Sequence, residues 1–489
     1  WYVAHSSLMA DMLPVANTQL GPGSLAAILG GVFEGGEDTI WIHPDPNFND
    51  EIVFNPEHPN WLLHKELLKA CKAKANGNYF VGMPDLMEGL DVLAALKGTD
   101  MVLLDTVMQP EVLEQQMQQI NDIYFKVFDE LYDIIREGDE MAFCYFSSWA
   151  PGKMSKLQSD ISTMISQDDY RRFVQPFIRE QCQKIDYTLY HLDGVGAMHH
   201  LPALLEIEEL NAIQWTPGVG EPQGGSPKWY DLYKKILAGG KSVMACWVTL
   251  EELKPLLDHI GADGVHLEMD FHNEREVEQA MRIIEEYTGS SSSVSADVHT
   301  NQPVGEQDNA QESIRIREEK SQEEDRLKPL YDAIVAGKLE PAVEVTKDAI
   351  AAGVLPQDII NGYMITAMGE VGQRFQDGKA FVPQLLMAGR AMKGALELLK
   401  PLLAGNASAT IGKIVIGTVK GDLHDIGKNL VASMLEGCGF EVINIGIDVT
   451  CDKFVEAVKE NKADILCMSA LLTTTMTYMQ DVIRALEEA

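Results

Sequence analysis

The sequence predicts an α/β protein, in which a (β/α)8 TIM-like barrel is followed by a four-helix bundle and a small Rossmann-like (flavodoxin-like) domain. Apolar β-type runs alternate with helical patterns over the first 288 residues, which is typical of a parallel sheet covered on both faces. Residues 319–404 show helical periodicity only, and residues 410–489 return to alternation. A chain of 489 residues is long enough for several such domains.

The barrel is predicted over residues 1–288. Six or more βα units over this length suit a barrel better than a small open sheet. Polar residues stand at the ends of the predicted strands, where a barrel builds its active site. The predicted strands are 101–105, 142–146, 187–191, 212–215, 243–247 and 264–268, and the predicted helices include 112–137, 168–184 and 228–238.

Residues 289–318 are predicted to form a flexible linker. The segment begins with Gly289 and a run of serines, and it has too little apolar content to offset the entropy of ordering. A coil of about 30 such residues spans roughly 30 Å. That reach would let the flanking parts meet in more than one arrangement.

Beyond the linker, breaks at 337–338, 353–356 and 377–378 divide residues 319–404 into four helices of a small bundle. Residues 410–489 then read as a doubly wound domain of three units. Such a domain normally has two further units, and the chain begins at Trp1 rather than Met, so we expect it to be cut at both ends. The predicted elements are strands 413–418, 441–446 and 465–469 and helices 425–437, 452–460 and 474–487.

Charge and cysteine usage limit the partners and the compartment. A formal net charge of −35 argues against nucleic acid or an anionic membrane surface as a partner. The seven cysteines form no CxxC pair, which favours reduced thiols over a disulfide framework. No long apolar run and no signal peptide is visible. We therefore expect a cytoplasmic protein with no membrane partner; a homo-oligomer stays open.

The strongest chemical signal follows the predicted strand 413–418, where the chain reads Gly421-Asp422-Leu423-His424-Asp425-Ile426-Gly427 and then starts a helix. Doubly wound domains bind ligands at this position. A carboxylate beside a histidine fixes its tautomer and raises its basicity, as is usual for a metal-ligating imidazole. Gly427 lets a bulky group pass close to the backbone. The third strand ends in Ser469-Ala-Leu-Leu-Thr473, whose hydroxyls are available to the same ligand.

Asp-x-His-x-x-Gly with Ser-x-Leu on the third strand resembles the cobalamin-binding domain of methionine synthase and of corrinoid methyl-carrier proteins. The resemblance implies a cobalamin cofactor whose cobalt is ligated by His424, with Asp422 as the partner of that histidine and Ser469 as the next relay member. This sequence departs from the family pattern because it lacks the family's final Gly-rich segment. The residues that the resemblance places at the cofactor in this domain are Gly421, Asp422, His424, Asp425, Ile426, Gly427, Ser469, Leu471 and Thr473.

The helices before this domain resemble the helical cap of the same family, through segments 368–375, 378–384 and 392–393. The resemblance implies that Phe375 and Val382 shield the upper face of the cobalt and its methyl group. Without the resemblance, both residues would be interpreted as ordinary bundle core.

Short motifs in the first 288 residues resemble the uroporphyrinogen decarboxylase superfamily, which includes corrinoid-dependent methyltransferases. The decarboxylase itself needs cationic side chains to hold several carboxylates, and no arginine cluster of that kind is seen here, so decarboxylation is not favoured. The motifs are Asp160-Ile161-Ser162, Ile165-Ser166, Phe173, 190–194 and 213–218.

Zinc methyltransferases of this superfamily bind their metal through His-x-Cys and a later Cys. Here the first pair reads His191-Leu192-Asp193, and a later strand offers His266-Leu267-Glu268. Three interpretations stay open: a second metal such as Zn²⁺ held by these histidines and carboxylates, direct substrate contact without metal, or a structural hydrogen-bonded pair. The catalytic candidates are His191, Asp193, Asp160 and Glu221, and Cys246 is either a further metal ligand or a buried apolar thiol.

Together the resemblances imply a corrinoid-dependent methyltransferase with a fused corrinoid carrier. It would move a methyl group from a small methylated substrate to Co(I) cobalamin and on to an acceptor. The implied partners are a separate acceptor methyltransferase and a corrinoid reductive activase. The alternatives are a barrel that acts on the acceptor side, passing the methyl group to a thiol or folate, and a non-catalytic cobalamin carrier or sensor. An adenosylcobalamin mutase is disfavoured by the helical cap.

Overall fold

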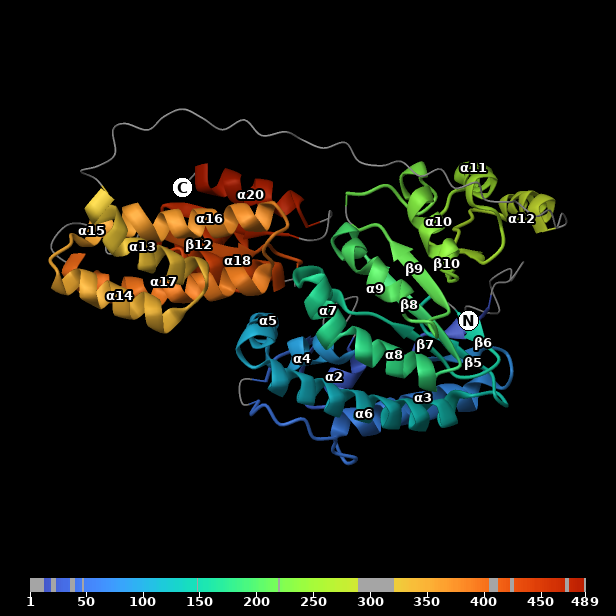
Figure 1. The fold of residues 1–489 in the computed structure, drawn as a ribbon. Helices are drawn as coiled ribbons and strands as arrows, with labels where there is room; N and C mark the ends of the chain where they lie inside the picture. Colours follow the sequence, from blue (N-terminus) through green and yellow to red (C-terminus); the bar gives the residue numbers. More distant parts are fainter. Residues whose placement is uncertain are drawn as a thin grey trace. The chain divides into compact units, whose positions relative to one another are not determined.

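The computed structural model describes residues 13–18, 23–35, 40–45, 48–146, 148–218, 220–288, 321–403, 412–422, 426–470 and 475–487. They belong to two compact units, Trp1–His299 and Thr300–Ala489 (Figure 1). The predicted linker 289–318 lies outside the described residues. Among the helices that are described, none has the length and apolar character needed to cross a membrane.

The N-terminal unit contains two sheets of mainly parallel strands, in which the strand order follows the sequence. The first sheet has the order β1-β4-β5-β6, and only its edge strand β6 is antiparallel. The second has the order β11-β10-β9-β8-β7 and is entirely parallel. The strands are β1 (Val15–Ala16), β4 (Phe80–Met83), β5 (Met141–Phe143), β6 (Trp149–Ala150), β7 (Met154–Leu157), β8 (Tyr187–Asp193), β9 (Ala212–Thr216), β10 (Ser242–Ala245) and β11 (Val265–Leu267).

These sheets confirm the α/β class and five of the six predicted strands, which appear as β5, β8, β9, β10 and β11. Four strands of these sheets, β1, β4, β6 and β7, were not predicted, and neither was a separate antiparallel hairpin of β2 (Val32–Gly35) and β3 (Ile40–His43). Sequential parallel order is what a (β/α)8 barrel requires. Closure of the two sheets into one barrel stays a prediction.

The predicted strand 101–105 is wrong, because these residues lie inside helix α5 (Thr99–Met108). Val102, Leu103 and Thr106 are buried while Met101 is exposed, which is a helical spacing. A short apolar run does not distinguish a strand from a buried helix. The predicted helix 168–184 is divided into α7 (Gln167–Phe173) and α8 (Gln175–Lys184), since Pro176 cannot continue a helix from the preceding turn.

The remaining helices of this unit pack around the sheets and bury its core. The long helix α6 (Pro110–Ile135), predicted as 112–137, packs along α3 (Pro59–Ala75). The others are α2 (Ser24–Ile28), α4 (Gly89–Lys97), η1 (Asp160–Met164), η2 (Val195–His200), α9 (Leu201–Leu205), η3 (Pro227–Trp229), α10 (Tyr230–Ala238), α11 (Leu250–Ile260) and α12 (Glu274–Thr288).

The C-terminal unit begins with the predicted helical bundle. Its third helix is built from three consecutive pieces, of which the middle one, η4, is a π-helix. Leu330, Ile334 and Leu399 are among the fully buried residues of the bundle core. The helices are α13 (Ser321–Val335), α14 (Leu339–Ala351), α15 (Pro356–Ile359) with η4 (Ile360–Met364) and α16 (Ile365–Gln376), and α17 (Val382–Leu403).

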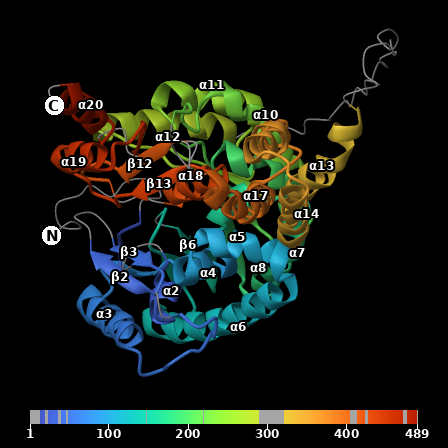
Figure 2. The ribbon, with the colours of Figure 1, turned by 90° about the vertical axis from the view of Figure 1, so that its left-hand side faces the viewer.

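A three-stranded parallel sheet of order β13-β12-β14 follows, and α18 packs along β12 and β13 (Figure 2). This is the start of a Rossmann-like, flavodoxin-type order, and it confirms each predicted element of this part. Helices α17 and α18 cross where Gly389 meets Gly437, at a separation that leaves no room for a side chain on Gly437. The elements are β12 (Lys413–Thr418), α18 (Ile426–Gly437), β13 (Glu441–Asn444), α19 (Cys451–Asn461), β14 (Ile465–Ser469) and α20 (Thr477–Glu487).

Candidate functional site

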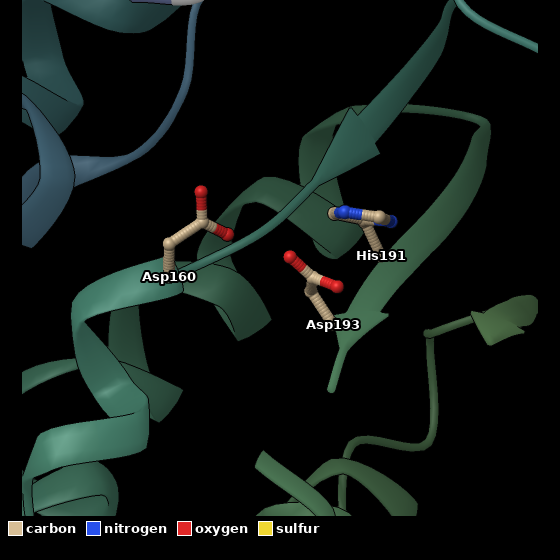
Figure 3. A group of neighbouring side chains, drawn as sticks. All are labelled: Asp160, His191 and Asp193. Atoms are coloured by element: carbon tan, nitrogen blue, oxygen red, sulfur yellow. The ribbon is translucent and has the colours of Figure 1, made fainter. Parts of the chain in front are cut away.

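Three of the predicted catalytic residues come together at the carboxyl end of β8. Asp160, His191 and Asp193 each offer one ligand atom, and these atoms all lie within 4.8 Å of one another. His191 and Asp193 are two positions apart on β8, so both side chains leave the same face of the strand. Asp160 is the first residue of η1, which follows β7, the neighbouring strand. Figure 3 shows the three side chains converging.

Loss of hydration and neighbouring charges shift the pKa values of Asp160 and His191. Asp160 is exposed to solvent. Even so, loss of hydration, together with the carboxylates of Asp91 and Asp193, raises the pKa of Asp160 well above its ordinary value. Burial, and then the Lys156 ammonium, lower the pKa of His191. His191 is therefore neutral at pH 7, with a ring nitrogen available as a ligand.

A buried charged network that the sequence analysis missed supports Asp160 from behind. Lys156 forms an ion pair with Asp85 at 2.6 Å, and the two side chains are 5% and 2% exposed. Lys156 also contacts the amide oxygen of Gln158, whose nitrogen donates to Asp160 at 3.0 Å. Burial alone would lower the pKa of Lys156, but the Asp85 carboxylate outweighs it and the pKa is raised.

Two further buried carboxylates complete this network. Asp91 accepts hydrogen bonds from the backbone N–H of Asp160 at 2.8 Å and of Ile161 at 3.0 Å, and so fixes the start of η1. Glu88 accepts from the backbone N–H of Gln158 at 2.7 Å. Burial raises the pKa of Asp91 to about 6 and that of Glu88 well above its ordinary value. The sequence did contain a signal for this network, because Asp85, Glu88 and Asp91 stand in an otherwise apolar stretch. Charged residues are rarely buried unless they are paired, so such a stretch indicates buried partners.

On the other side, His191 contacts Gln214, which lies opposite it on β9. Gln214 is completely buried and reaches Thr216 and Cys246 as well. Gln214 lies in the predicted strand 212–215, but it was not among the predicted site residues. The ring of Phe146 packs against the His191 ring, with 5.9 Å between centroids.

The other predicted barrel residues lie outside the group of three. Glu221 forms an ion pair with Lys228. His266 is exposed on β11, and Glu268 follows that strand, with its backbone N–H donating to the carbonyl of Ala245 at 2.9 Å. Among the described residues, the group able to hold a metal contains Asp160 in place of His266 and Glu268.

At the carboxyl edge of the β13-β12-β14 sheet, the structure describes Asp422 but not Leu423, His424 and Asp425. Asp422 is completely buried, and its Oδ2 accepts a hydrogen bond from the Thr475 hydroxyl at 2.7 Å. Thr475 was not predicted. It lies six residues beyond Ser469, at the end of a run of three threonines. That run of hydroxyl groups after the third strand was the sequence feature from which a hydrogen-bonding role could have been predicted.

The backbone around Asp422 leaves space for a bulky ligand. Gly421 has a φ of +81°, which favours glycine, and its N–H donates to Asp448 at 2.8 Å. A Cβ added to Gly427 would meet no atom of the described residues within 4 Å. The described residues at this edge therefore fit a large cofactor that approaches the start of α18.

The remaining predicted cofactor residues are only partly described. Ser469 ends β14, and its carbonyl accepts from Val419 at 3.0 Å. Leu471 and Thr473 lie outside the described residues, as does the side chain of Ile426. In the cap, Phe375 is 44% exposed at the end of α16, whereas Val382 is 5% exposed at the start of α17. Their shielding roles stay predictions.

Comparison with known proteins agrees with this geometry. A family model described as B12 binding domain matches residues 412–489, and a second B12 binding domain model matches residues 326–400. Trimethylamine corrinoid protein 1 of Methanosarcina mazei is 44% identical over 160 residues, which are 32% of this chain and 74% of that protein. Dimethylamine corrinoid protein 1 of Methanosarcina acetivorans is 44% identical over 167 residues, covering 34% and 78%. The methanol:cobalamin methyltransferase complex MtaBC from Methanosarcina barkeri is 32% identical, covering 36% of this chain and 70% of that chain, with a TM-score of 0.31.

The bundle and the Rossmann-like domain thus define a corrinoid-binding module. Through this C-terminal part, the chain belongs to the corrinoid protein family, and its cofactor is cobalamin.

Proposed function

We propose that this protein is a corrinoid-dependent methyltransferase whose N-terminal unit takes a methyl group from a small methylated substrate and passes it to cobalamin in the C-terminal unit. The observation that carries the proposal is the Asp160–His191–Asp193 group, on the same chain as a corrinoid-binding module. A cluster of convergent ionisable groups with shifted pKa values at strand ends is typical of an active site.

Asp160, His191 and Asp193 would hold a divalent metal, for which Zn²⁺ is the first candidate. One imidazole nitrogen and two carboxylate oxygens make three protein ligands, which leaves a fourth position for substrate. The metal would polarise the oxygen or nitrogen that leaves when the methyl group is transferred. Direct substrate contact by the same side chains is the alternative, and metal analysis of the purified protein distinguishes the two.

In the C-terminal unit, His424 would be a ligand of the cobalt, and Co(I) cobalamin would supply the nucleophile for the methyl group. The contact between Asp422 and Thr475 supports a relay behind His424, in which the Thr475 hydroxyl steadies the carboxylate. Ser469 stays a predicted relay member. Gly421, Asp425, Ile426, Gly427, Leu471 and Thr473 would line the cofactor.

Residues 1–288 would form a closed barrel, 289–318 a linker, 319–404 the cap and 410–489 the cobalamin domain. One carrier would then visit the barrel, a separate acceptor methyltransferase and a reductive activase. The free thiols are in keeping with a cytoplasmic site. The acceptor-side reaction and a carrier-only role are the competing proposals. Asp193 and Glu268 stand where the superfamily has its thiol-activating cysteines, which disfavours the acceptor-side reaction and keeps the carrier-only role open.

A donor panel tests the proposal. The full chain is loaded with hydroxocobalamin, reduced to Co(I) without oxygen, and mixed with methoxy-aromatic compounds, methylamines, betaines and methyl halides while the visible spectrum is followed. We expect one donor class to consume the Co(I) band, and Asp193→Asn to slow that reaction. If no class reacts while cobalamin stays bound, the barrel does not act on the donor side.

The Thr475 contact gives a separate prediction. Thr475→Val leaves a buried carboxylate oxygen of Asp422 without this partner, and loss of such an outer hydrogen bond typically lowers metal affinity by about 10–100-fold. We expect weaker cobalamin binding in an equilibrium titration. Thr475→Ser keeps the hydroxyl and should bind as the unchanged protein does. Equal affinities for the Val and Ser variants would remove Thr475 from the relay.

A further inference from the structure

Asp448 holds the backbone around Asp422 from a neighbouring loop. This loop, residues 445–450, joins β13 to α19 at the carboxyl edge of the C-terminal sheet. Oδ1 of Asp448 accepts a hydrogen bond from the backbone N–H of Gly421 at 2.8 Å. The backbone N–H of Asp448 donates to the carbonyl of Asp422 at 3.2 Å. One residue of the loop thus contacts two successive residues at the start of the cofactor motif.

Left-handed backbone at two positions allows these contacts. Gly421 has a φ of +81° and Asp448 has a φ of +50°. Glycine adopts this region without steric cost, and asparagine and aspartate tolerate it better than other side chains. A β-branched or bulky residue at position 448 would be strained. The residue type at this position is therefore restricted by the backbone and, independently, by the need for a side-chain acceptor.

The rest of the loop is fixed to the end of β12 and to the core. The backbone N–H of Val449 donates to the carbonyl of Thr418 at 3.0 Å, and the N–H of Thr418 donates to the carbonyl of Gly446 at 2.9 Å. Val449 also pairs with Val419 in an isolated parallel bridge. Val419 and Val449 are 0% and 2% exposed and belong to one hydrophobic cluster. Because the loop is anchored on both sides of Asp448, this residue has a fixed place from which to hold the motif.

Asp422 is therefore held from two separate loops. The Thr475 hydroxyl, which follows β14, donates to the carboxylate of Asp422 at 2.7 Å. Asp448, which follows β13, contacts its main chain. The first contact orients the side chain of Asp422, and the second fixes the backbone that carries it.

We propose that Asp448 is a positioning residue for cobalamin binding, which acts through the backbone of Gly421 and Asp422 to keep the start of the cofactor motif in its binding conformation. Asp448 acts as a hydrogen-bond acceptor, and its charge is not required. The effect on cobalamin affinity rests on the cofactor alone. Only the effect on cobalt ligation rests on the proposed role of His424.

Glycine and asparagine at position 448 separate the hydrogen bond from the backbone conformation. Both suit a φ of +50°, but asparagine keeps a side-chain oxygen that accepts from Gly421, whereas glycine has none. The full chain of each variant is titrated to equilibrium with hydroxocobalamin. We expect Asp448→Asn to bind as the unchanged protein does and Asp448→Gly to bind about 3–10-fold more weakly. One hydrogen bond contributes up to about tenfold to a loop equilibrium, and molecules outside the binding conformation lower the apparent affinity.

Lys462→Gly is the matched control. Lys462 has the same φ of +50° and is exposed, but it lies at the C-cap of α19, before β14 begins and so at the amino edge of the sheet. This variant should bind cobalamin as the unchanged protein does. Equal affinities for Asp448→Gly and Asp448→Asn overturn the inference, whether both bind normally or both bind more weakly.

A second readout concerns the cobalt itself. The full chain is labelled with ¹⁵N-histidine, saturated with cobalamin, reduced to Co(II) and examined by electron paramagnetic resonance. A ligating ¹⁵N nucleus splits each cobalt line into a doublet, whereas ¹⁴N of the cofactor's own base gives a triplet. We expect the doublet in the unchanged protein and in Asp448→Asn, and a smaller share of it in Asp448→Gly. If the unchanged protein shows no ¹⁵N coupling, the proposed role of His424 fails, while the affinities still decide the role of Asp448.

Discussion

His191→Ala is expected to lower the rate of donor-dependent methyl transfer by about 10³-fold or more, with no change in cobalamin binding. His191 supplies the only nitrogen among the three converging ligand atoms. A polarising metal contributes several kcal/mol to the transition state, and each 1.36 kcal/mol corresponds to a factor of ten in rate. The measurement is the rate of Co(I) consumption at saturating donor, with the cobalamin content of each variant determined beforehand.

The control is His259→Ala, an exposed histidine on α11 that contacts Lys234 and lies outside the group of three. Its rate should equal that of the unchanged protein. A His191→Ala protein that keeps a full metal content and more than about a tenth of the rate would contradict a ligand role.

Lys156→Met is expected to destabilise the N-terminal unit by about 3–5 kcal/mol, because it leaves the Asp85 carboxylate buried without its cation. All seven tryptophans lie at or before position 247, so tryptophan emission in a urea titration reports the unfolding of this unit alone. The quantity compared is the free energy of unfolding extrapolated to water.

Two further variants isolate the cause. Lys153 lies three residues before Lys156 and forms an exposed ion pair with Asp129. Lys153→Met removes that pair and should lower the free energy of unfolding by at most about 1 kcal/mol. In the double variant Lys156→Met/Asp85→Leu the buried Asp85 carboxylate is removed together with its cation, and most of the stability should return. If the double variant is as unstable as Lys156→Met, the loss comes from packing rather than from charge.

The sequence predicted those parts whose signal is local. The strands around His191 and Gln214 are continuous apolar runs, and the helices of the bundle have clear periodicity and glycine breaks, so both were found. Helix α5 was mistaken for a strand, because the four consecutive apolar residues at 101–104 satisfy both patterns. Strands such as β1, with two residues, are too short to show any period.

The candidate site was predictable only where residues share one strand or one motif. His191 and Asp193 alternate on β8, so their meeting follows from the sequence, whereas the pairing of Asp422 with His424 stays a prediction. Asp160 was predicted as a catalytic candidate in a separate motif, and its proximity to His191 follows from the parallel pairing of β7 and β8. The Thr475 contact spans 53 residues and depends on the junction of β14 with β12.

By itself, then, the sequence determined the order of domains, the cobalamin motif and the two residues of β8, because periodicity and short spacings are written along the chain. Tertiary structure alone decided that Asp160 completes the group in place of His266, that Lys156 and Asp85 form an ion pair beside it, and that Gln214 contacts both His191 and Cys246. These are contacts between separate strands and helices. Their partners are set by sheet register and by the requirement that buried polar groups find one another, which no local pattern encodes.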